Sequence, residues 1–198
     1  NDTLVAGDGN DQYLEAGDDN DSLTGGIGNQ QYLDGDAGND TLVAGGGTGQ
    51  IVFGDSGQDS LRGAAEAERL EGGVGDDTLD GDDGNDTLIG GNDNDSLIGG
   101  SGNDFASYAG ATDAITVDLG LGSSAGEHGN DALSNIENVL GGDGNDSLIG
   151  DAIDNVLDGG NGNDTIAGSA GNDTLLGGDG EDVGDFRGFG VTVTIDLV

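Results

Sequence analysis

The chain has 198 residues, and its 41 Asp and Glu against only 3 Lys and Arg give a formal net charge of −38. This charge excludes nucleic acid as a partner and disfavours anionic membrane surfaces, because both are bound through cationic side chains. The absence of Cys excludes disulfides and thiolate metal sites, and no apolar run approaches the ~20 residues of a membrane-spanning helix or belongs to a signal peptide.

So acidic a chain would ordinarily be disordered, but two features of this sequence argue for a folded structure. Asp outnumbers Glu by 34 to 7, whereas solvating acidic tails use both residues. The apolar residues also recur at fixed intervals. The acidic residues therefore need a structural explanation.

An apolar residue recurs periodically through most of the chain. In the first part the interval is nineteen residues, at Leu4, Leu23, Leu42 and Leu61. The interval then shortens to nine residues, at Leu61, Leu70, Leu79, Leu88 and Leu97. A second nine-residue series occupies Leu148, Leu157, Ile166 and Leu175. A constant period of this kind is the signature of a repeat architecture.

Each nine-residue repeat has the form Gly-Gly-x-Gly-Asn-Asp-Thr-Leu-x, as in residues 141–149. The first six residues, called positions one to six here, suit a tight turn because Gly and Asn accept positive φ, and the same glycines disfavour a helix. The last three make a short strand with one inward side chain. Two repeats complete one coil, so we predict an all-β fold, a parallel β-roll with 18 or 19 residues per rung and a leucine core.

The rhythm of the repeats predicts four segments. Residues 1–104 are the first block of the β-roll, residues 105–140 an irregular β insertion with short strands, residues 141–185 the second block, and residues 186–198 the start of a further interruption. The chain begins inside a repeat, and the strand-like stretch at 114–119 is restated near its end at 191–197. We therefore expect it to be part of a longer array.

The aspartates at position six are the candidate metal ligands. One buried Leu returns only about 2–3 kcal/mol against roughly 9–18 kcal/mol to order nine residues. Two carboxylates stacked ~5 Å apart add about 3 kcal/mol of repulsion at an effective dielectric constant of ~20. Calcium removes this repulsion and takes six to eight oxygen ligands, whereas zinc prefers His or Cys and magnesium keeps its waters. The sequence therefore predicts several bound Ca²⁺ ions.

The same motif resembles the RTX (repeats-in-toxin) haemolysin-type calcium-binding nonapeptide repeat, over roughly residues 1–104 and 141–185. The resemblance implies that each ion lies between two turns on the same edge, one rung apart. It implies carbonyl ligands from positions two and four of one turn and a carboxylate from its position six. The next turn on that edge supplies the carbonyls of positions one and three and its own Asp.

Carried onto this sequence, the resemblance implies three groups of metal ligands. In the region of nineteen-residue period they are Gly17, Asp19, Asp21, Gly35, Asp36, Ala37, Gly38, Asp40, Gly54, Asp55, Ser56, Gly57, Asp59, Gly72 and Val74. In the rest of the first block they are Gly73, Gly75, Asp77, Asp82, Gly84, Asp86, Gly90, Asn92, Asp95, Gly99, Ser101 and Asp104. In the second block they are Gly142, Gly144, Asp146, Gly159, Gly160, Asn161, Gly162, Asp164, Gly168, Ala170, Asp173, Gly177, Asp179 and Asp182.

Departures from the motif predict an asymmetry between the two edges. One edge keeps its aspartates at Asp2, Asp21, Asp40 and Asp59. The other edge begins with Asp11 and continues with Gln30, Gly49 and Glu68. We expect this edge to be metal-free from Gln30 to Glu68, with packing of Tyr32, Ile51, Val52 and Phe53 in place of ions. Asn155 is likewise expected to weaken the site that it shares with Asp173.

No arrangement in the sequence predicts an enzyme. His128, Glu127 and Glu137 lie in a loop-like break rather than in a motif that pairs a base with an acid. A flat array of Thr and Ser at the first strand position is compatible with ice binding. The RTX-like ice-binding segments place Thr within the turn, however, where this chain has Asp8, Asp18, Ile27 and Ala37.

Two functions stay open on the sequence alone. The first is a structural or adhesive module of a large secreted bacterial surface or extracellular protein, such as an adhesin, an S-layer component or a filament subunit. The resemblance implies type I secretion and folding on calcium after export. The alternative is the carboxy-terminal secretion and folding module of a secreted protease, lipase or polysaccharide epimerase. The expected partners are calcium, copies of the chain and neighbouring domains, at the cell surface or outside the cell.

Overall fold

The computed structural model describes residues 1–185 and the backbone of residues 194–196, and in that part of the chain every regular element is a β-strand. Twelve strands form one sheet, in the order β1 (Thr3–Val5), β3 (Ser22–Thr24), β5 (Thr41–Val43), β7 (Ser60–Arg62), β9 (Thr78–Asp80), β11 (Ser96–Ile98), β15 (Ala132–Ser134), β14 (Ser123–Ala125), β13 (Thr116–Asp118), β17 (Ser147–Ile149), β19 (Thr165–Ala167) and β21 (Val183–Gly184).

Ten strands form the second sheet. Their order is β2 (Tyr13–Glu15), β4 (Tyr32–Asp34), β6 (Gln50–Ser56), β8 (Glu68–Val74), β10 (Thr87–Asn92), β12 (Phe105–Ser107), β16 (Asn138–Leu140), β18 (Val156–Asp158), β20 (Thr174–Leu176) and β22 (Thr194–Asp196).

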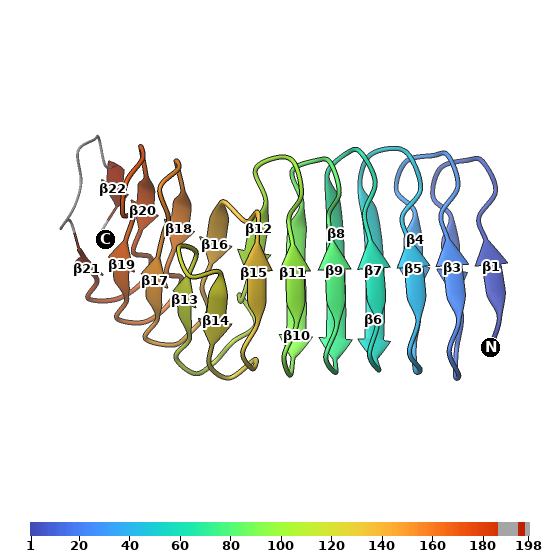
Figure 1. The fold of residues 1–198 in the computed structure, drawn as a ribbon, viewed down its shortest axis with the longest axis horizontal. Coiled ribbons are helices and arrows are strands. Elements are labelled where there is room, and N and C mark those ends of the chain that lie inside the picture. The colour runs from blue at the N-terminus through green and yellow to red at the C-terminus, as the bar shows by residue number, and fades with distance from the viewer. Residues whose placement is uncertain (186–193, 197–198) are drawn as a thin grey trace.

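The chain alternates between these two sheets with nearly every strand, which confirms the predicted parallel β-roll (Figure 1). Leu4 pairs with Leu23, nineteen residues on, and Leu61 pairs with Leu79, eighteen residues on. One rung therefore consists of two strands and two turns, as the spacing of the leucines predicts. The tight turns are the only connections between strands in the regular rungs, so turn residues line both edges.

The middle residue of each short strand points into the space between the sheets. Twelve Leu and Ile side chains among them, from Leu23 to Leu175, are less than 2% exposed, as are the smaller Val52, Ala106, Val117 and Val139. Flanking strand residues point outward and are partly exposed, as the alternation of a strand requires. The predicted leucine core is thus confirmed. Each strand contributes only one side chain to it.

Residues 105–140 modify the roll without ending it. β12 continues the ten-stranded sheet, whereas β13, β14 and β15 enter the other sheet as antiparallel neighbours. The twelve-stranded sheet is therefore wider at this point, with β14 between β13 and β15 (Figure 1). Parallel pairing resumes where β13 meets β17.

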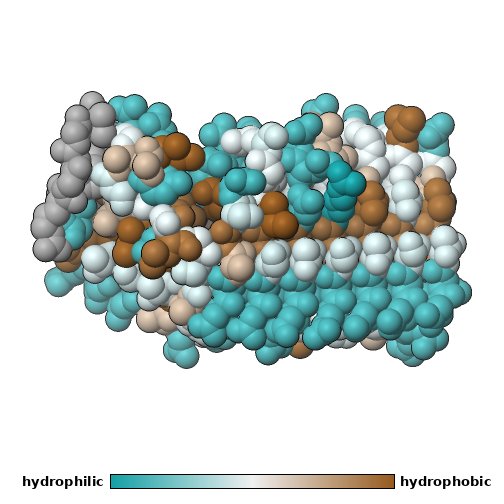
Figure 2. All heavy atoms as spheres, in the orientation of Figure 1, coloured by the Kyte–Doolittle hydropathy of each residue, from teal (hydrophilic) through white to brown (hydrophobic). Residues whose placement is uncertain are grey.

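The hydrophilic residues are not spread evenly over the roll. Figure 2 shows a continuous hydrophilic band along one edge, where the turns lie. Two of the three cationic side chains form local ion pairs, Arg62 with Asp82 at 2.7 Å and Arg69 with Glu71 at 2.8 Å.

The predicted start of a further interruption falls largely outside the described residues. This applies to Arg187, Val191 and Val193, and to the side chain of Ile195. The backbone of β22 pairs in parallel with β20. Within the described part of the chain, no helix has the length and apolarity needed to cross a membrane.

Candidate metal centres

The turns place their position-six residues in two columns, one on each edge of the roll. The first edge comprises the turns that lead into the twelve-stranded sheet, with Asp21, Asp40, Asp59, Asp77, Asp95, Asp131, Asp146, Asp164 and Asp182 at position six. The second edge comprises the turns that lead into the ten-stranded sheet, with Gln12, Gln31, Gln50, Glu68, Asp86, Asp104, Glu137, Asn155 and Asp173 at position six. Each of these residues except Asp182, which precedes Gly184, lies two positions before an inward-pointing side chain.

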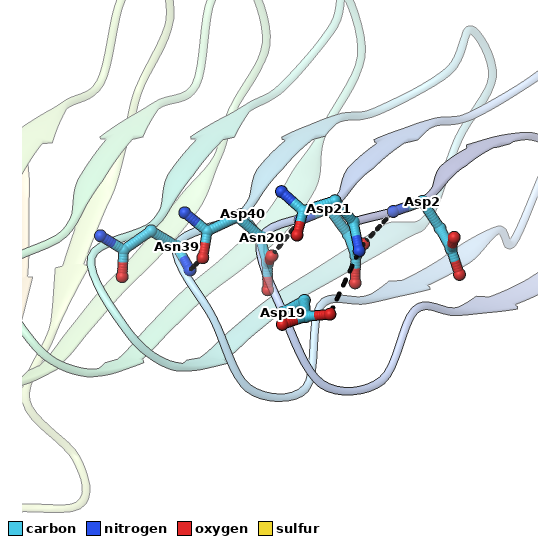
Figure 3. Close-up of polar contacts among 7 residues, drawn as sticks. Asp2, Asp19, Asn20, Asp21, Asn39 and Asp40 are labelled. Carbon is cyan, nitrogen blue, oxygen red and sulfur yellow. Dashed lines mark hydrogen bonds and ion pairs between the residues drawn. The ribbon is translucent and has the colours of Figure 1, made fainter.

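One oxygen of each stacked aspartate is held by the backbone of the rung before it. The Asp21 N–H donates to Asp40 Oδ1 at 2.7 Å, and the Asp40 N–H donates to Asp59 Oδ1 at 2.7 Å. Figure 3 shows the start of this series, together with the parallel series at position five, where the Asn39 N–H donates to Asn20 Oδ1 at 3.0 Å. These hydrogen bonds fix the orientation of every carboxylate along the edge.

The second oxygen of most of these carboxylates is buried and accepts no hydrogen bond from any described residue. Such oxygens are Asp21 Oδ2, Asp40 Oδ2, Asp59 Oδ2, Glu68 Oε1, Asp77 Oδ2, Asp86 Oδ2, Asp95 Oδ2, Asp104 Oδ2, Asp164 Oδ2, Asp173 Oδ2 and Asp182 Oδ2. A buried acceptor without a partner costs about 1–3 kcal/mol, and more when it is charged. A cation at each turn would satisfy these oxygens.

The electrostatic consequence is visible in the pKa values of these carboxyl groups. Burial, together with the charges of Asp77 and Asp40, raises the pKa of Asp59 to about 7. Burial also raises the pKa of Asp86 and of Asp95 to about 7. The folded chain by itself therefore disfavours the ionised form that a metal site needs, and a bound cation reverses this preference.

In most of the turns position one is a glycine beside the unpartnered oxygen, whereas Ala16 holds this position in the turn of Asp21. A Cβ placed on Gly54 would lie 2.5 Å from Asp59 Oδ2 and 2.6 Å from the carbonyl oxygen of Gly72. On the second edge, a Cβ on Gly81 would lie 2.5 Å from Asp86 Oδ2. The turn thus has a space bordered by a carboxylate and by a carbonyl of the next rung, and any larger residue would fill it.

The other predicted carbonyl ligands also connect neighbouring rungs. The Asp36 carbonyl accepts a hydrogen bond from the Ser56 N–H at 2.9 Å, and the Ser56 carbonyl accepts one from the Gly38 N–H at 2.9 Å. The same arrangement links Asp82 to Ser101 at 2.8 Å. Each of these carbonyls keeps a second lone pair, so the hydrogen bonds leave it able to coordinate a metal.

The donor set fits calcium. It consists of carboxylate and carbonyl oxygens, supplied at repeated intervals by two turns one rung apart. Ca²⁺ takes six to eight such oxygens at 2.3–2.6 Å in flexible geometry. The structure brings the predicted partners together in pairs, such as Asp40 with Asp59, Asp86 with Asp104, and Asp146 with Asp164 through an N–H to Oδ1 distance of 2.7 Å.

The structure corrects the predicted alignment of the second edge by one residue. Position six is held by Gln12, Gln31 and Gln50, rather than by Asp11, Gln30 and Gly49. The inward leucines set the alignment, and the tenth residue of each longer unit is accommodated in the turn with positive φ.

That tenth residue is identified by its backbone conformation. Asp11, Gln30 and Gly49 have φ values of 56°, 57° and 72°, in the left-handed region. Glu68, where the nine-residue period resumes, occupies position six as predicted, and its N–H donates to Asp86 Oδ1 at 2.8 Å.

The insertion contributes two carboxylates to the columns that the sequence motif did not identify as ligands. Asp131 Oδ1 accepts the Asp95 N–H at 3.0 Å, and Glu137 Oε2 accepts the Asp104 N–H at 2.8 Å. Unlike Asp95, Asp131 has a satisfied second oxygen, to which the hydroxyls of Tyr108 and Ser124 donate at 2.9 and 2.8 Å. The second oxygen of Asp146 is also satisfied, by the Gly142 N–H at 2.9 Å. Counting two residues back from the inward Leu133 would have found Asp131.

Another carboxylate group lies on the outside of the roll. Asp34, Asp36 and Asp55 bring carboxylate oxygens within 4.8 Å of one another. Burial and the charge of Asp55 raise the pKa of Asp34. The motif assigns only the backbone carbonyls of Asp36 and Asp55 as ligands. The proximity of their side-chain carboxylates is therefore not part of the motif.

The residues considered for catalysis make structural contacts. His128 Nδ1 lies 2.8 Å from the Gly91 carbonyl oxygen, and its ring packs edge-on against Tyr108. Glu127 accepts hydrogen bonds from the backbone N–H groups of Thr112 and Asp113 at 2.6 and 2.8 Å. The contacts of Glu127 join two loops of the insertion, and that of His128 joins the insertion to the first block.

Comparison with known proteins agrees with the geometry of the turns. The family model for the RTX calcium-binding nonapeptide repeat (4 copies) matches residues 1–29, 32–51, 50–79, 71–106, 131–164 and 149–184. No curated protein gives a significant match. Because the family matches cover most of the chain and include both columns of buried carboxylates, the chain belongs to the RTX calcium-binding nonapeptide repeat family.

Proposed function

We propose that the chain is a calcium-dependent structural or adhesive module of a large secreted bacterial surface or extracellular protein, and that it has no catalytic role of its own. The observation that supports this most directly is the series of buried carboxylate oxygens without hydrogen-bond partners. These oxygens make the folded state costly without a cation and favourable with one. The metal ligands are those named above for the two blocks of repeats.

Calcium is proposed to control when the module folds. The core consists of one inward side chain from each strand, and it is too thin to offset both chain entropy and charge repulsion between rungs. Calcium affinities of extracellular modules lie near 10⁻⁴–10⁻³ M. At the low calcium level of a cytoplasm the chain would stay unfolded, which suits export as an unfolded polypeptide. It would fold outside the cell.

A structural rather than catalytic role is supported by what the described side chains do. His128 contacts the backbone of Gly91 in the first block and Glu127 contacts the backbone of the insertion, rather than the two acting on each other as a base and an acid. The outer faces of the two sheets are long and regular, and they offer extended surfaces rather than an enclosed substrate site. This arrangement suits a spacer or an adhesive segment.

The test is folding as a function of calcium, followed by far-ultraviolet circular dichroism. In calcium-free buffer at pH 7.5 we expect a coil spectrum, and millimolar CaCl₂ should restore a β spectrum. The same concentration of MgCl₂ is the control and should not restore it. A β spectrum of equal strength in the presence of chelator would refute calcium-dependent folding.

The location of the module is tested separately. Fractionation of the producing bacterium, with an antibody raised against residues 1–185, should find the protein in the medium or at the cell surface. Recovery from the cytoplasm alone would contradict the proposed secretion. A mass far above 19 kDa for the detected band is expected if the module is part of a longer chain.

A further inference from the structure

The second edge has buried glutamines where the turns of the first edge have aspartates. Gln31 and Gln50 are each 1% exposed and occupy position six. They face the interior of the turn, as Asp40 and Asp59 do on the first edge. A neutral side chain at this place changes the chemistry of the turn, because it carries hydrogen-bond donors as well as an acceptor.

The glutamine oxygen makes the same rung-to-rung contact as an aspartate oxygen. The Gln31 N–H donates to Gln50 Oε1 at 3.0 Å, which matches the contact of the Asp40 N–H with Asp59 Oδ1 at 2.7 Å. The backbone of the second edge is therefore held in the same way, and only the second atom of the side-chain head group differs.

That second atom is a nitrogen which contacts a turn carbonyl of the preceding rung. Gln50 Nε2 donates to the carbonyl oxygen of Gly28 at 2.7 Å, and Gln31 Nε2 donates to that of Gly9 at 3.5 Å. In most of the aspartate turns, those of Asp40 and Asp59 included, the equivalent oxygen has no partner among the described residues. The amide N–H thus takes the place of a cation as the partner of the turn carbonyl.

The amide also makes calcium binding unfavourable. Its N–H groups would point at the ion, and no buried negative charge is present at Gln31 or Gln50 to be neutralised. Gln31 Oε1 accepts no hydrogen bond from a described residue, but a neutral carbonyl oxygen without a partner costs less than a carboxylate oxygen.

The longer unit and the glutamine occur together. Gln30 and Gly49, each with positive φ, directly precede the two glutamines. Where the unit shortens, at Glu68, the carboxylate contacts begin. On the outer face of the same strands, Tyr32 packs against Tyr13 and Phe53 with ring centroids 4.8 and 5.0 Å apart, which adds contacts between the rungs.

We infer that the side-chain amides of Gln31 and Gln50 replace bound calcium on the second edge. The rungs that contain them carry ions on the first edge only, beside Asp21, Asp40 and Asp59. This inference rests on the proposed calcium binding of the other turns. It adds that the glutamine amides make calcium unnecessary in these turns of the second edge. Hydrogen bonds of the glutamines therefore connect these rungs on the second edge without a metal ion.

The direct test is a crystal structure of the full chain grown in CaCl₂, with calcium located by its anomalous scattering. We expect peaks beside the first-edge aspartates and none within 3 Å of the side chains of Gln31 and Gln50. A calcium peak coordinated by either glutamine would overturn the inference. A protein that binds no calcium anywhere would instead overturn the proposed function, so the two failures are distinguishable.

A variant tests the contribution of the amide independently of crystals. Gln50→Glu keeps the size of the side chain and the acceptor for Gln31, but it loses the donor to Gly28 and buries a charge. At saturating calcium we expect Gln50→Glu either to bind one ion more than the natural chain, counted by native mass spectrometry, or, if no ion enters, to melt about 3 °C or more lower. The matched control is Gln58→Glu, the same change at an exposed side chain, which should leave the melting temperature unchanged. Equal melting temperatures together with equal ion counts for Gln50→Glu and the natural chain would overturn the inference.

Discussion

The backbone N–H of Asp59 donates to Asp77 Oδ1 at 2.8 Å, while Asp77 Oδ2 is buried without a partner among the described residues. A single carboxylate thus performs two tasks. One oxygen aligns successive rungs, and the other is left for a cation. Replacing the aspartate by asparagine separates the two, because the amide keeps the aligning oxygen and loses the charged one.

We therefore predict that Asp77→Asn lowers calcium affinity without abolishing the fold. At saturating calcium it should lose about 2 kcal/mol of stability, within the range for a hydrogen bond or ligand contact to a charged group. The number of bound ions, measured by native mass spectrometry, should fall by one or two. The control is Asp76→Asn at the exposed position five, where other repeats already have Asn20 and Asn39. Identical ion counts for both variants would contradict a ligand role for Asp77.

The pH dependence of the calcium-free chain should be the reverse of ordinary acid denaturation. Burial raises the pKa of Asp59, Asp86 and Asp95 from 3.8 to about 7. A carboxyl group whose pKa is higher in the folded state stabilises that state at low pH, and the contribution is lost as the pH rises through the folded pKa. Without calcium, β structure should therefore increase as the pH falls from about 8 to about 4.5.

Circular dichroism in calcium-depleted buffer measures this effect. At saturating calcium the trend should invert below about pH 6, because protons then compete with the ions for the same carboxylates. A calcium-free chain that loses β structure on acidification would show that the buried carboxylates do not dominate its stability.

The hydroxyl of Tyr108 is predicted to matter for stability but not for calcium. It donates to Asp131 Oδ2 at 2.9 Å, in the one first-edge turn where hydroxyls satisfy the second oxygen of the described aspartate. Tyr108→Phe should cost about 1 kcal/mol at saturating calcium, since Ser124 still donates to Asp131. Tyr13→Phe is the control, because Tyr13 is 57% exposed. Urea unfolding measures both, and a changed ion count for Tyr108→Phe would contradict the prediction.

Much of the fold follows from the sequence because the repeat fixes both its period and its inward residue. The spacing of Leu61 and Leu79 predicts the pairing that the structure shows. In the longer units the Asn-Asp pair of the motif predicts position six one residue too early, because the inward leucine sets the alignment. Counting two residues back from Leu33 identifies Gln31.

The contacts of the insertion could not be predicted in this way. Tyr108 and Asp131 are 23 residues apart, and no period connects them. The antiparallel pairing of β13 with β14 depends on a local reversal at residues 119–122, within a sheet whose other pairs are almost all parallel. Such contacts depend on where a loop meets the existing rungs, and that information is not carried by the nonapeptide motif.

The last prediction concerns the glycine at position one. A Cβ on Gly54 would lie 2.5 Å from Asp59 Oδ2 and 2.6 Å from the Gly72 carbonyl oxygen, distances that real Cβ atoms do not tolerate. Gly54→Ala should therefore displace an oxygen that faces the ion and weaken calcium binding at this rung. Gly46→Ala is the matched control, because a Cβ there meets no atom within 4 Å and its φ is not positive. Calcium titrations followed by circular dichroism should show a higher midpoint for Gly54→Ala, by a factor of about ten if one ligand contact worth ~1.4 kcal/mol is lost. The midpoint of Gly46→Ala should not move. If the two variants titrate alike, the space beside Gly54 is not part of a metal site, and the buried oxygen of Asp59 must be satisfied in another way.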